Sequence, residues 1–398
     1  MPTVTSVPGV YIEEDASPAI SVSQGATAVP LFITLLTPID KGNLDVIIRI
    51  SSWLSFTQLF SAETAETAET AETAETAETA ETAETTETTE TTETTETGNQ
   101  AQQAASYQAI RLYFQNGGGA CYVLATAAGD DDAFKALPEQ IEAVGEITLI
   151  SVPENDAAFR EKVYAGLKEL LNKNQGYFLL ADSADGEVSD SLKNSSHVAV
   201  YYPALLPVGD SAEAVMPSAL MAAVYCKTDR ERGVWKAPAN VVLSGVSDVS
   251  VRLTDDDQGA LNLAGINVIR YFRDRGAVVW GARTLQNDDN WRYIPVRRLF
   301  DAAERDIKKA ILPMVFEPNH QLTWQRVHTA IENYLHSLWR QGGLSGNKAS
   351  EAYFVRIGKD VTMTTDDINQ GKMIVQVGMA AVRPAEFIIL QFTQDMSQ

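Results

Sequence analysis

The sequence predicts a mixed α/β protein, with an α/β core domain, then a compact C-terminal α+β domain, and an extended β arm at each end. Through the first two thirds of the 398 residues, short apolar runs alternate with helical patterns, which is typical of a layered α/β unit. The last third holds two amphipathic helical patterns and three strand-like runs. We expect domains at residues 1–28, 29–288 and 289–385, with a closing arm at 386–398.

The first 28 residues predict the amino-terminal arm. Pro8 and Gly9 interrupt regular structure, and Val10, Tyr11 and Ile12 form a short β-prone run that acidic residues follow. Such a segment has no local core to join, so we expect it to pair with the edge of another sheet. Because the chain opens with neither a basic leader nor a long apolar run, we expect a soluble product made in the cytoplasm.

The core domain is predicted from apolar and β-branched runs between helical patterns. The strands are expected at residues 28–36, 46–50, 121–124, 147–152, 177–180, 198–202, 266–271 and 277–280. The helices are expected at residues 52–60, 101–116, 159–171 and 217–230. The glycines at 117–119 follow a helix and precede a strand, the reverse of the order in a phosphate-binding loop, and therefore predict a turn.

A low-complexity tract at residues 62–97 interrupts the core domain. Ala-Glu-Thr triplets pass into Thr-Glu-Thr triplets, and this period of three matches neither a helix nor a strand. No side chain in the tract is apolar and larger than alanine, so none can hold it against a core. We expect a flexible acidic insertion in a surface loop, either a tolerated expansion or a spacer.

The last third predicts a helix at 297–312 and a second that begins near Asn319 and ends before Gly342. The first has an apolar face and an opposite face that carries Asp301, Glu304, Arg305, Lys308 and Lys309. Strand-like runs follow at 352–357, 373–382 and 386–392.

Charge and motif content argue against several classes of function. The formal charge of −22, from 53 acidic and 31 basic residues, disfavours a protein that grips nucleic acid or an anionic membrane. Asp130–Asp132 and Asp255–Asp257 lack the spacing of a calcium loop and are interpreted as solvated loop acids. Cys121 and Cys226 are expected to be buried free thiols. The four histidines form no catalytic or metal motif, so we expect no catalytic residue, no metal and no cofactor.

Four stretches in order resemble the contractile phage tail sheath family. They are residues 8–14 (PGVYIEE) with 26–30 (ATAVP), 233–240 (GVWKAPAN) with 267–270 (NVIR) and 276–285 (GAVVWGARTL), 291–300 (WRYIPVRRLF) with 316–319 (FEPN), and 382–389 (VRPAEFII). The arm sequence and the length are most similar to sheath subunits of extracellular contractile injection systems, the antifeeding-prophage and virulence-cassette type. The acidic triplet tract departs from the family pattern.

The resemblance implies a structural subunit, not an enzyme, that forms stacked helical rings of hexameric type around an inner tube. Contraction would eject the tube without nucleotide. The implied partners are further copies of the chain, the inner tube protein, and baseplate and terminal cap proteins, without nucleic acid or direct insertion into a membrane. Assembly in the bacterial cytoplasm and release as an extracellular phage-tail-like particle are implied as well.

The resemblance also implies two sets of contact residues. Terminal arms of the family add strands to neighbouring subunits, which assigns strand exchange to Val10, Tyr11 and Ile12 and to Phe387, Ile388, Ile389, Leu390 and Phe392. The family's C-terminal domain faces the tube through a polar helix, which assigns tube contact to Glu304, Arg305, Lys308 and Lys309. A solvated helix face with an internal Glu304–Lys308 pair is the alternative. An α/β enzyme and a non-contractile structural or adhesin-like protein are the rival functions.

Overall fold

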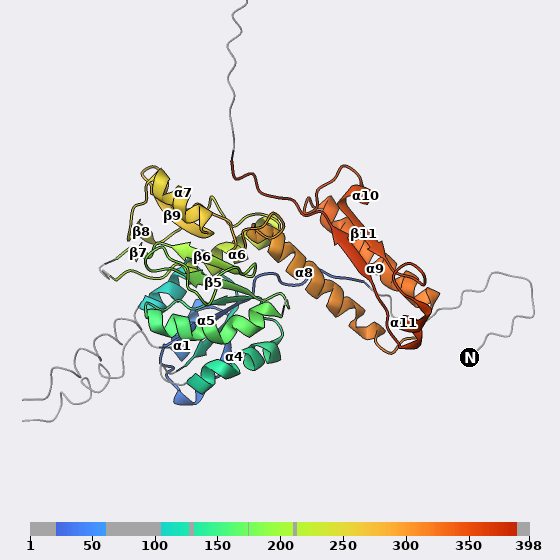
Figure 1. Cartoon of the computed structure of the whole chain (residues 1–398). Helices are drawn as coiled ribbons and strands as arrows, with labels where there is room; N and C mark the ends of the chain where they lie inside the picture. Colours follow the sequence, from blue (N-terminus) through green and yellow to red (C-terminus); the bar gives the residue numbers. More distant parts are fainter. Residues whose placement is uncertain (1–20, 61–104, 127–130, 174, 210–212, 388–398) are drawn as a thin grey trace, which may run out of the picture.

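The computed structural model describes residues 21–60, 105–126, 131–173, 175–209 and 213–387, and the acidic tract lies outside these ranges. A large α/β unit and a small α+β unit are joined by one long helix, α8 (Ile294–Ile311) (Figure 1). The fold class predicted from the sequence is confirmed. The domain boundary at residue 289 stays a prediction, because α8 buries its first turns against the large unit and its later turns in the small one.

The middle layer of the large unit is an eight-stranded sheet in the order β10-β9-β6-β5-β4-β1-β3-β2. The six inner strands run parallel, and β2 and β10 close the two edges in antiparallel orientation. A strand that is covered on both faces has a continuous run of apolar residues, and this is why these strands could be predicted from the sequence. The strands are β1 (Pro30–Thr34), β2 (Ile47–Ile50), β3 (Cys121–Ala125), β4 (Leu149–Ser151), β5 (Phe178–Asp182), β6 (Val198–Tyr202), β9 (Ile266–Phe272) and β10 (Gly276–Val279).

Helices cover both faces of this sheet. One face packs on α4 (Asp131–Val144) and α5 (Ala157–Asn172), and the other on α1 (Trp53–Leu59), a helix at residues 105–115 and α6 (Ser218–Arg232). The predicted helices at 52–60, 159–171 and 217–230 are confirmed, as is the described part of the one at 101–116. The glycine turn is confirmed too, with Gly117 at φ +91° ending the 105–115 helix.

Two predictions of loop acids were wrong. Asp131 and Asp132 begin α4, a helix that was not predicted from the sequence, and Asp130 lies outside the described residues. Asp255, Asp256 and Asp257 form the first turn of α7 (Asp255–Leu263), where Thr254 and Asp257 make a capping box. Carboxylates are favourable at this end of a helix because its free N–H groups carry partial positive charge. Between β6 and α7 a two-stranded sheet of β7 (Leu205–Pro207) and β8 (Val246–Val249) flanks the large unit.

The small unit packs α8 and α9 (Gln321–Arg340) against a two-stranded sheet of β11 (Tyr353–Arg356) and β12 (Gln376–Met379). The 3-10 helices η1 (Lys41–Asn43) and η3 (Leu312–Met314) and short helices α10 (Ala349–Ala352) and α11 (Thr365–Asn369) complete the fold. The predicted strand at 373–382 is shorter than expected. The prediction of a strand from Glu386 was wrong in its described part, because Glu386 and Phe387 belong to none.

Candidate interaction surfaces

Residues 21–29, which we call the arm root, cross from the small unit to the large one. Val22 packs on the small-unit core, and the Gly25 N–H donates to Asp306 Oδ1 of α8 at 3.0 Å. Further along, the Thr148 hydroxyl donates to the Thr27 carbonyl at 2.9 Å and accepts the Val29 N–H at 2.8 Å. The amino-terminal arm is therefore held at its base by side chains of both units.

A buried ion pair joins the arm root to α6 and α8. Arg298 donates from both terminal nitrogens to Asp229, at 3.0 and 2.7 Å, and its Nη2 also donates to the Thr27 carbonyl at 3.0 Å. The guanidinium lies over the Tyr225 ring at 4.7 Å, and the two charged side chains are only 4% and 6% exposed. Burial disfavours the charged guanidinium, but Asp229 raises the pKa of Arg298 above its ordinary value.

The polar face of α8 divides into a buried part and an exposed part. Asp301, which the sequence placed on the polar face, is buried between Arg297 Nε at 2.9 Å and His197 Nε2 at 3.3 Å. Glu304, Lys308 and Lys309 are exposed, and Glu304 lies 3.5 Å from Arg297 Nη2. Arg305 is half-buried with its Nη2 3.4 Å from the Gly176 carbonyl, and burial lowers the pKa of its guanidinium. Three of the four predicted tube-contact residues are thus accessible.

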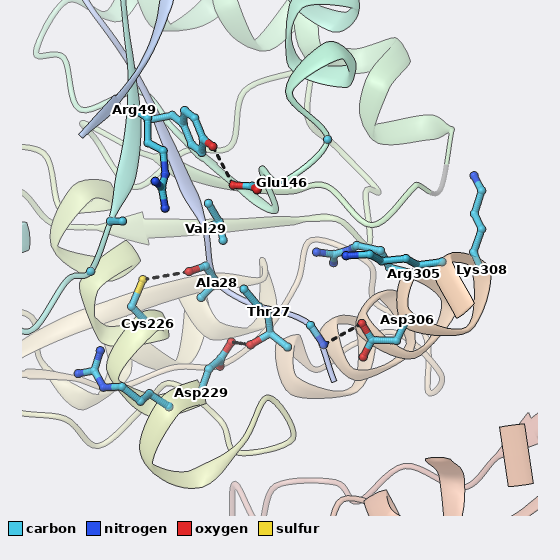
Figure 2. A pocket seen from close by; sticks show the side chains of 18 of the residues that line it. Thr27, Ala28, Val29, Arg49, Glu146, Cys226, Asp229, Arg305, Asp306 and Lys308 are labelled. Atoms are coloured by element: carbon cyan, nitrogen blue, oxygen red, sulfur yellow. Dashed lines mark hydrogen bonds between the residues drawn. The ribbon is translucent and has the colours of Figure 1, made fainter. Parts of the chain in front are cut away.

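An open groove of about 920 Å³ runs beside the arm root, between α8 and the large unit (Figure 2). Figure 2 shows Arg305 and Lys308 along α8, with Asp306 turned toward the arm root. The acids of the groove have partners, since Glu146 accepts from Tyr122 and Asp306 accepts from Tyr334, each at 2.8 Å. The lining of the groove carries charge of both signs, with the basic side chains Arg49, Arg230, Arg305, Lys308 and Lys309 beside the acidic side chains Glu146, Asp229 and Asp306.

The other described end of the chain returns from the small unit to the large one. Glu386 receives hydrogen bonds from Arg283, at 2.9 Å from Nε and 2.7 Å from Nη2, from Asn262 at 2.9 Å and from Tyr293 at 3.1 Å. Phe387 beyond it is 72% exposed. The other predicted strand-exchange residues lie outside the described residues; they are Val10, Tyr11, Ile12, Ile388, Ile389, Leu390 and Phe392.

The usual ligand edge of the large sheet is closed by its own side chains. Ligands of open α/β sheets bind beyond the carboxyl ends of the strands. Here Glu154, fully buried, accepts the Leu35 N–H at 2.7 Å, and Asp182, 7% exposed, accepts the Ser218 N–H at 2.8 Å. Burial raises the pKa of each carboxyl to about 7. These carboxyls serve as acceptors for backbone groups and are not open to a substrate.

Other chemistry is equally limited in the described ranges. Cys121 and Cys226 are buried free thiols, as predicted, and burial raises the pKa of both. No cluster of three or more histidine, cysteine or acidic side chains suited to a metal occurs among the residues with described positions. Within the same residues, no helix has the length and hydropathy of a membrane span.

The sequence analysis assigned no role to Arg298, Arg283 or Glu386. Arg283 lies beyond the strand expected at residues 277–280, and Arg298 stands beside Arg297 in the helix expected at 297–312, so neither side chain was predicted to be buried. A buried arginine requires a carboxylate partner. The partner itself could not be found from the sequence.

Two family models match adjacent parts of the chain, the phage tail sheath protein central domain at residues 192–285 and the phage tail sheath C-terminal domain at 286–395. Together with the α/β sheet unit and the smaller α+β unit, they define the chain as a tail sheath protein. The chain belongs to the phage tail sheath family.

Solved structures show the particular kind of sheath that the chain resembles. It is 57% identical to the anti-feeding prophage helical sheath in the contracted state, over 98% of this chain and 100% of that one, with a TM-score of 0.82. A chain of the anti-feeding prophage baseplate structure is also 57% identical, over 99% and 100%, with a TM-score of 0.80. The PVC sheath complex of an extracellular contractile injection system, also contracted, is 41% identical over 99% of each chain, with a TM-score of 0.76.

A curated relative, the putative prophage major tail sheath protein of Pseudomonas aeruginosa (strain UCBPP-PA14), is 32% identical over 96 residues. That alignment spans 23% of this chain and 25% of the relative.

Proposed function

We propose that this chain is the sheath subunit of an extracellular contractile injection particle. It forms stacked helical rings of hexameric type around an inner tube and drives tube ejection by contraction. The observation that carries the proposal is the 57% identity, over nearly the whole chain, to a sheath solved in its contracted state. A baseplate structure among the relatives supports contact with baseplate proteins, and a terminal cap completes the proposed set of partners.

Strand exchange by the two terminal arms is the proposed linkage between subunits. The arm root is fixed by Asp306, Thr148 and the Arg298–Asp229 pair, and the other end of the chain by Arg283. Because the arm root and the Glu386 end are both held by hydrogen bonds, the residues beyond them can link this subunit to its neighbours. Added strands contribute backbone hydrogen bonds with little demand on side chains, which suits a linkage that persists while subunits rotate.

Tube contact is assigned to the exposed face of α8. Glu304, Lys308 and Lys309 are exposed on one helix, and surface ion pairs contribute only about 0–1 kcal/mol each. Contacts of this strength can be broken together when the sheath expands. Arg305, which faces the large unit, is proposed to hold α8 in place and not to meet the tube.

Contraction is proposed to release energy stored in assembly, with no enzymatic step. The carboxyl edge of the sheet is occupied by Glu154 and Asp182, which supports a subunit without a nucleotide site there. The extended sheath would be a metastable arrangement that relaxes to a better packed one when the baseplate triggers it. Assembly takes place in the bacterial cytoplasm before the particle is released.

Electron microscopy of the purified chain, alone and with its tube protein, tests the proposal. Long hollow cylinders of stacked rings are expected, and deletion of residues 1–19 should abolish them while leaving the subunit folded. Monomers or small closed oligomers in the presence of the tube would contradict it. In the same assay, Lys308→Glu with Lys309→Glu should weaken binding to the tube, and Lys348→Glu on the small unit serves as the control.

A further inference from the structure

The Glu386 carboxylate is the last strongly bonded side chain before the described chain ends at residue 387. It accepts a two-nitrogen hydrogen bond from Arg283 and single bonds from Asn262 and Tyr293. The pair is largely buried, with the Arg283 side chain 10% and the Glu386 side chain 20% exposed. Burial alone would raise the pKa of Glu386, but the bonds from Arg283 and Asn262 outweigh it and lower the pKa, so the carboxylate stays ionised.

Arg283 is itself attached to the middle of the large sheet. Its N–H donates to Asn267 Oδ1 at 2.7 Å, and Asn267 Nδ2 donates to the Arg283 carbonyl at 2.8 Å. Asn267 is fully buried on β9 and also donates to the Val200 carbonyl of the neighbouring β6 at 3.2 Å. A Cβ on Gly281 would lie 2.9 Å from the Asn267 Cα, so the two backbones touch here. The path from Glu386 to the sheet is short and rigid.

The alternative attachment of the chain end is much weaker. Residues 382–385, just upstream of Glu386, form no helix or strand, and the strand before them is β12, which has four residues. β12 pairs with β11 in a two-stranded sheet whose other strand is also four residues long. None of the β12 residues is fully buried. A strand of this kind opens locally at low cost.

We propose that Glu386 is a mechanical anchor that passes tension from the C-terminal arm into the eight-stranded sheet and spares β12. The inference rests on the proposed exchange of that arm between subunits. Tension that enters at residue 388 reaches Glu386 before it reaches β12. With the anchor in place, the force continues through Arg283 and Asn267 to β9 and β6; without it, the force acts on β12 directly.

Hydrogen exchange of full-length protein, measured both as free subunits and as assembled contracted sheaths, tests the anchor. In sheaths, Glu386→Ala should speed amide exchange at residues 376–382 about tenfold or more, because a charge-assisted hydrogen bond is lost under load. In free subunits the same peptide should change by less than about twofold, because no neighbour pulls on the arm. Asp248→Ala is the control, since it removes another two-nitrogen pair, with Arg252, that is more exposed and is unconnected to either arm.

Comparing free subunits with assembled sheaths separates an effect of tension on the arm from a general loss of stability. Acceleration confined to sheaths supports the anchor, whereas equal acceleration in both states, or none in sheaths, overturns it. Glu386→Gln keeps an oxygen acceptor and should give a smaller effect than Glu386→Ala. If neither variant assembles although both melt at the wild-type temperature, the residue directs assembly and the role as a mechanical anchor is wrong. Failure of the wild-type chain to form sheaths would instead count against the proposed function.

Discussion

The Arg298–Asp229 pair offers a sharp test of how the arm root, α6 and α8 are held together. Asp229→Ala removes the only carboxylate that the structure places against the Arg298 guanidinium within the described residues, and it also removes the acceptor of the Thr27 hydroxyl at 2.5 Å. An arginine side chain that is 4% exposed then keeps its charge with no carboxylate to balance it, and only the Thr27 carbonyl and the Tyr225 ring still contact it. Breaking a buried pair from one side costs about 3–5 kcal/mol. We expect that loss in the free energy of unfolding.

Urea unfolding of dilute free subunits, followed by tryptophan fluorescence and circular dichroism, measures the loss. With a slope of about 2–3 kcal/mol/M, the midpoint should fall by roughly 1–2.5 M. The double variant Asp229→Leu with Arg298→Met removes both charges and should recover most of the stability, because apolar side chains of similar size can replace a buried pair. A loss below about 1 kcal/mol in Asp229→Ala would refute the reasoning. So would a double variant whose loss of stability is as large as the summed losses of its two single substitutions.

Three further predictions concern the large unit. Because burial raises the pKa of Glu154 and Asp182 to about 7, the folded chain binds more protons than the unfolded chain from about pH 4 to 7, so stability should fall as pH rises through that range. Glu154→Gln should remove about half of this fall in urea titrations at pH 5 and 8, and an unchanged profile would contradict the assignment. Gly166→Ala should lower stability by about 1–3 kcal/mol, because its Cβ would lie 2.6 Å from the Phe134 carbonyl oxygen of α4. Gly259→Ala on α7, with no atom within 4 Å of its Cβ, is the control and should stabilise slightly. Cys121 and Cys226 should resist a thiol reagent until urea unfolds the chain, and rapid reaction in buffer would show that their burial is wrong.

The sequence alone located most elements of the large unit and identified the family resemblance. Strands such as β5 and β6 are buried on both faces, so their apolar runs are continuous and local. α9 buries only one face, so its apolar residues recur as a stripe at helical spacing. The sequence pattern did not locate α4 or α7, because each begins with acidic residues that are also common in loops; in α7 one of them, Asp257, belongs to the capping box.

Only the tertiary structure decided which polar side chains meet. Arg298 and Asp229 are 69 residues apart and Arg283 and Glu386 are 103 apart, and no local pattern relates such positions. The same holds for the two faces of α8, because Asp301 and Glu304 are equally polar in sequence and differ only in what packs against them. Local periodicity determines elements through short-range backbone geometry, whereas ion pairs form where the fold brings distant segments together.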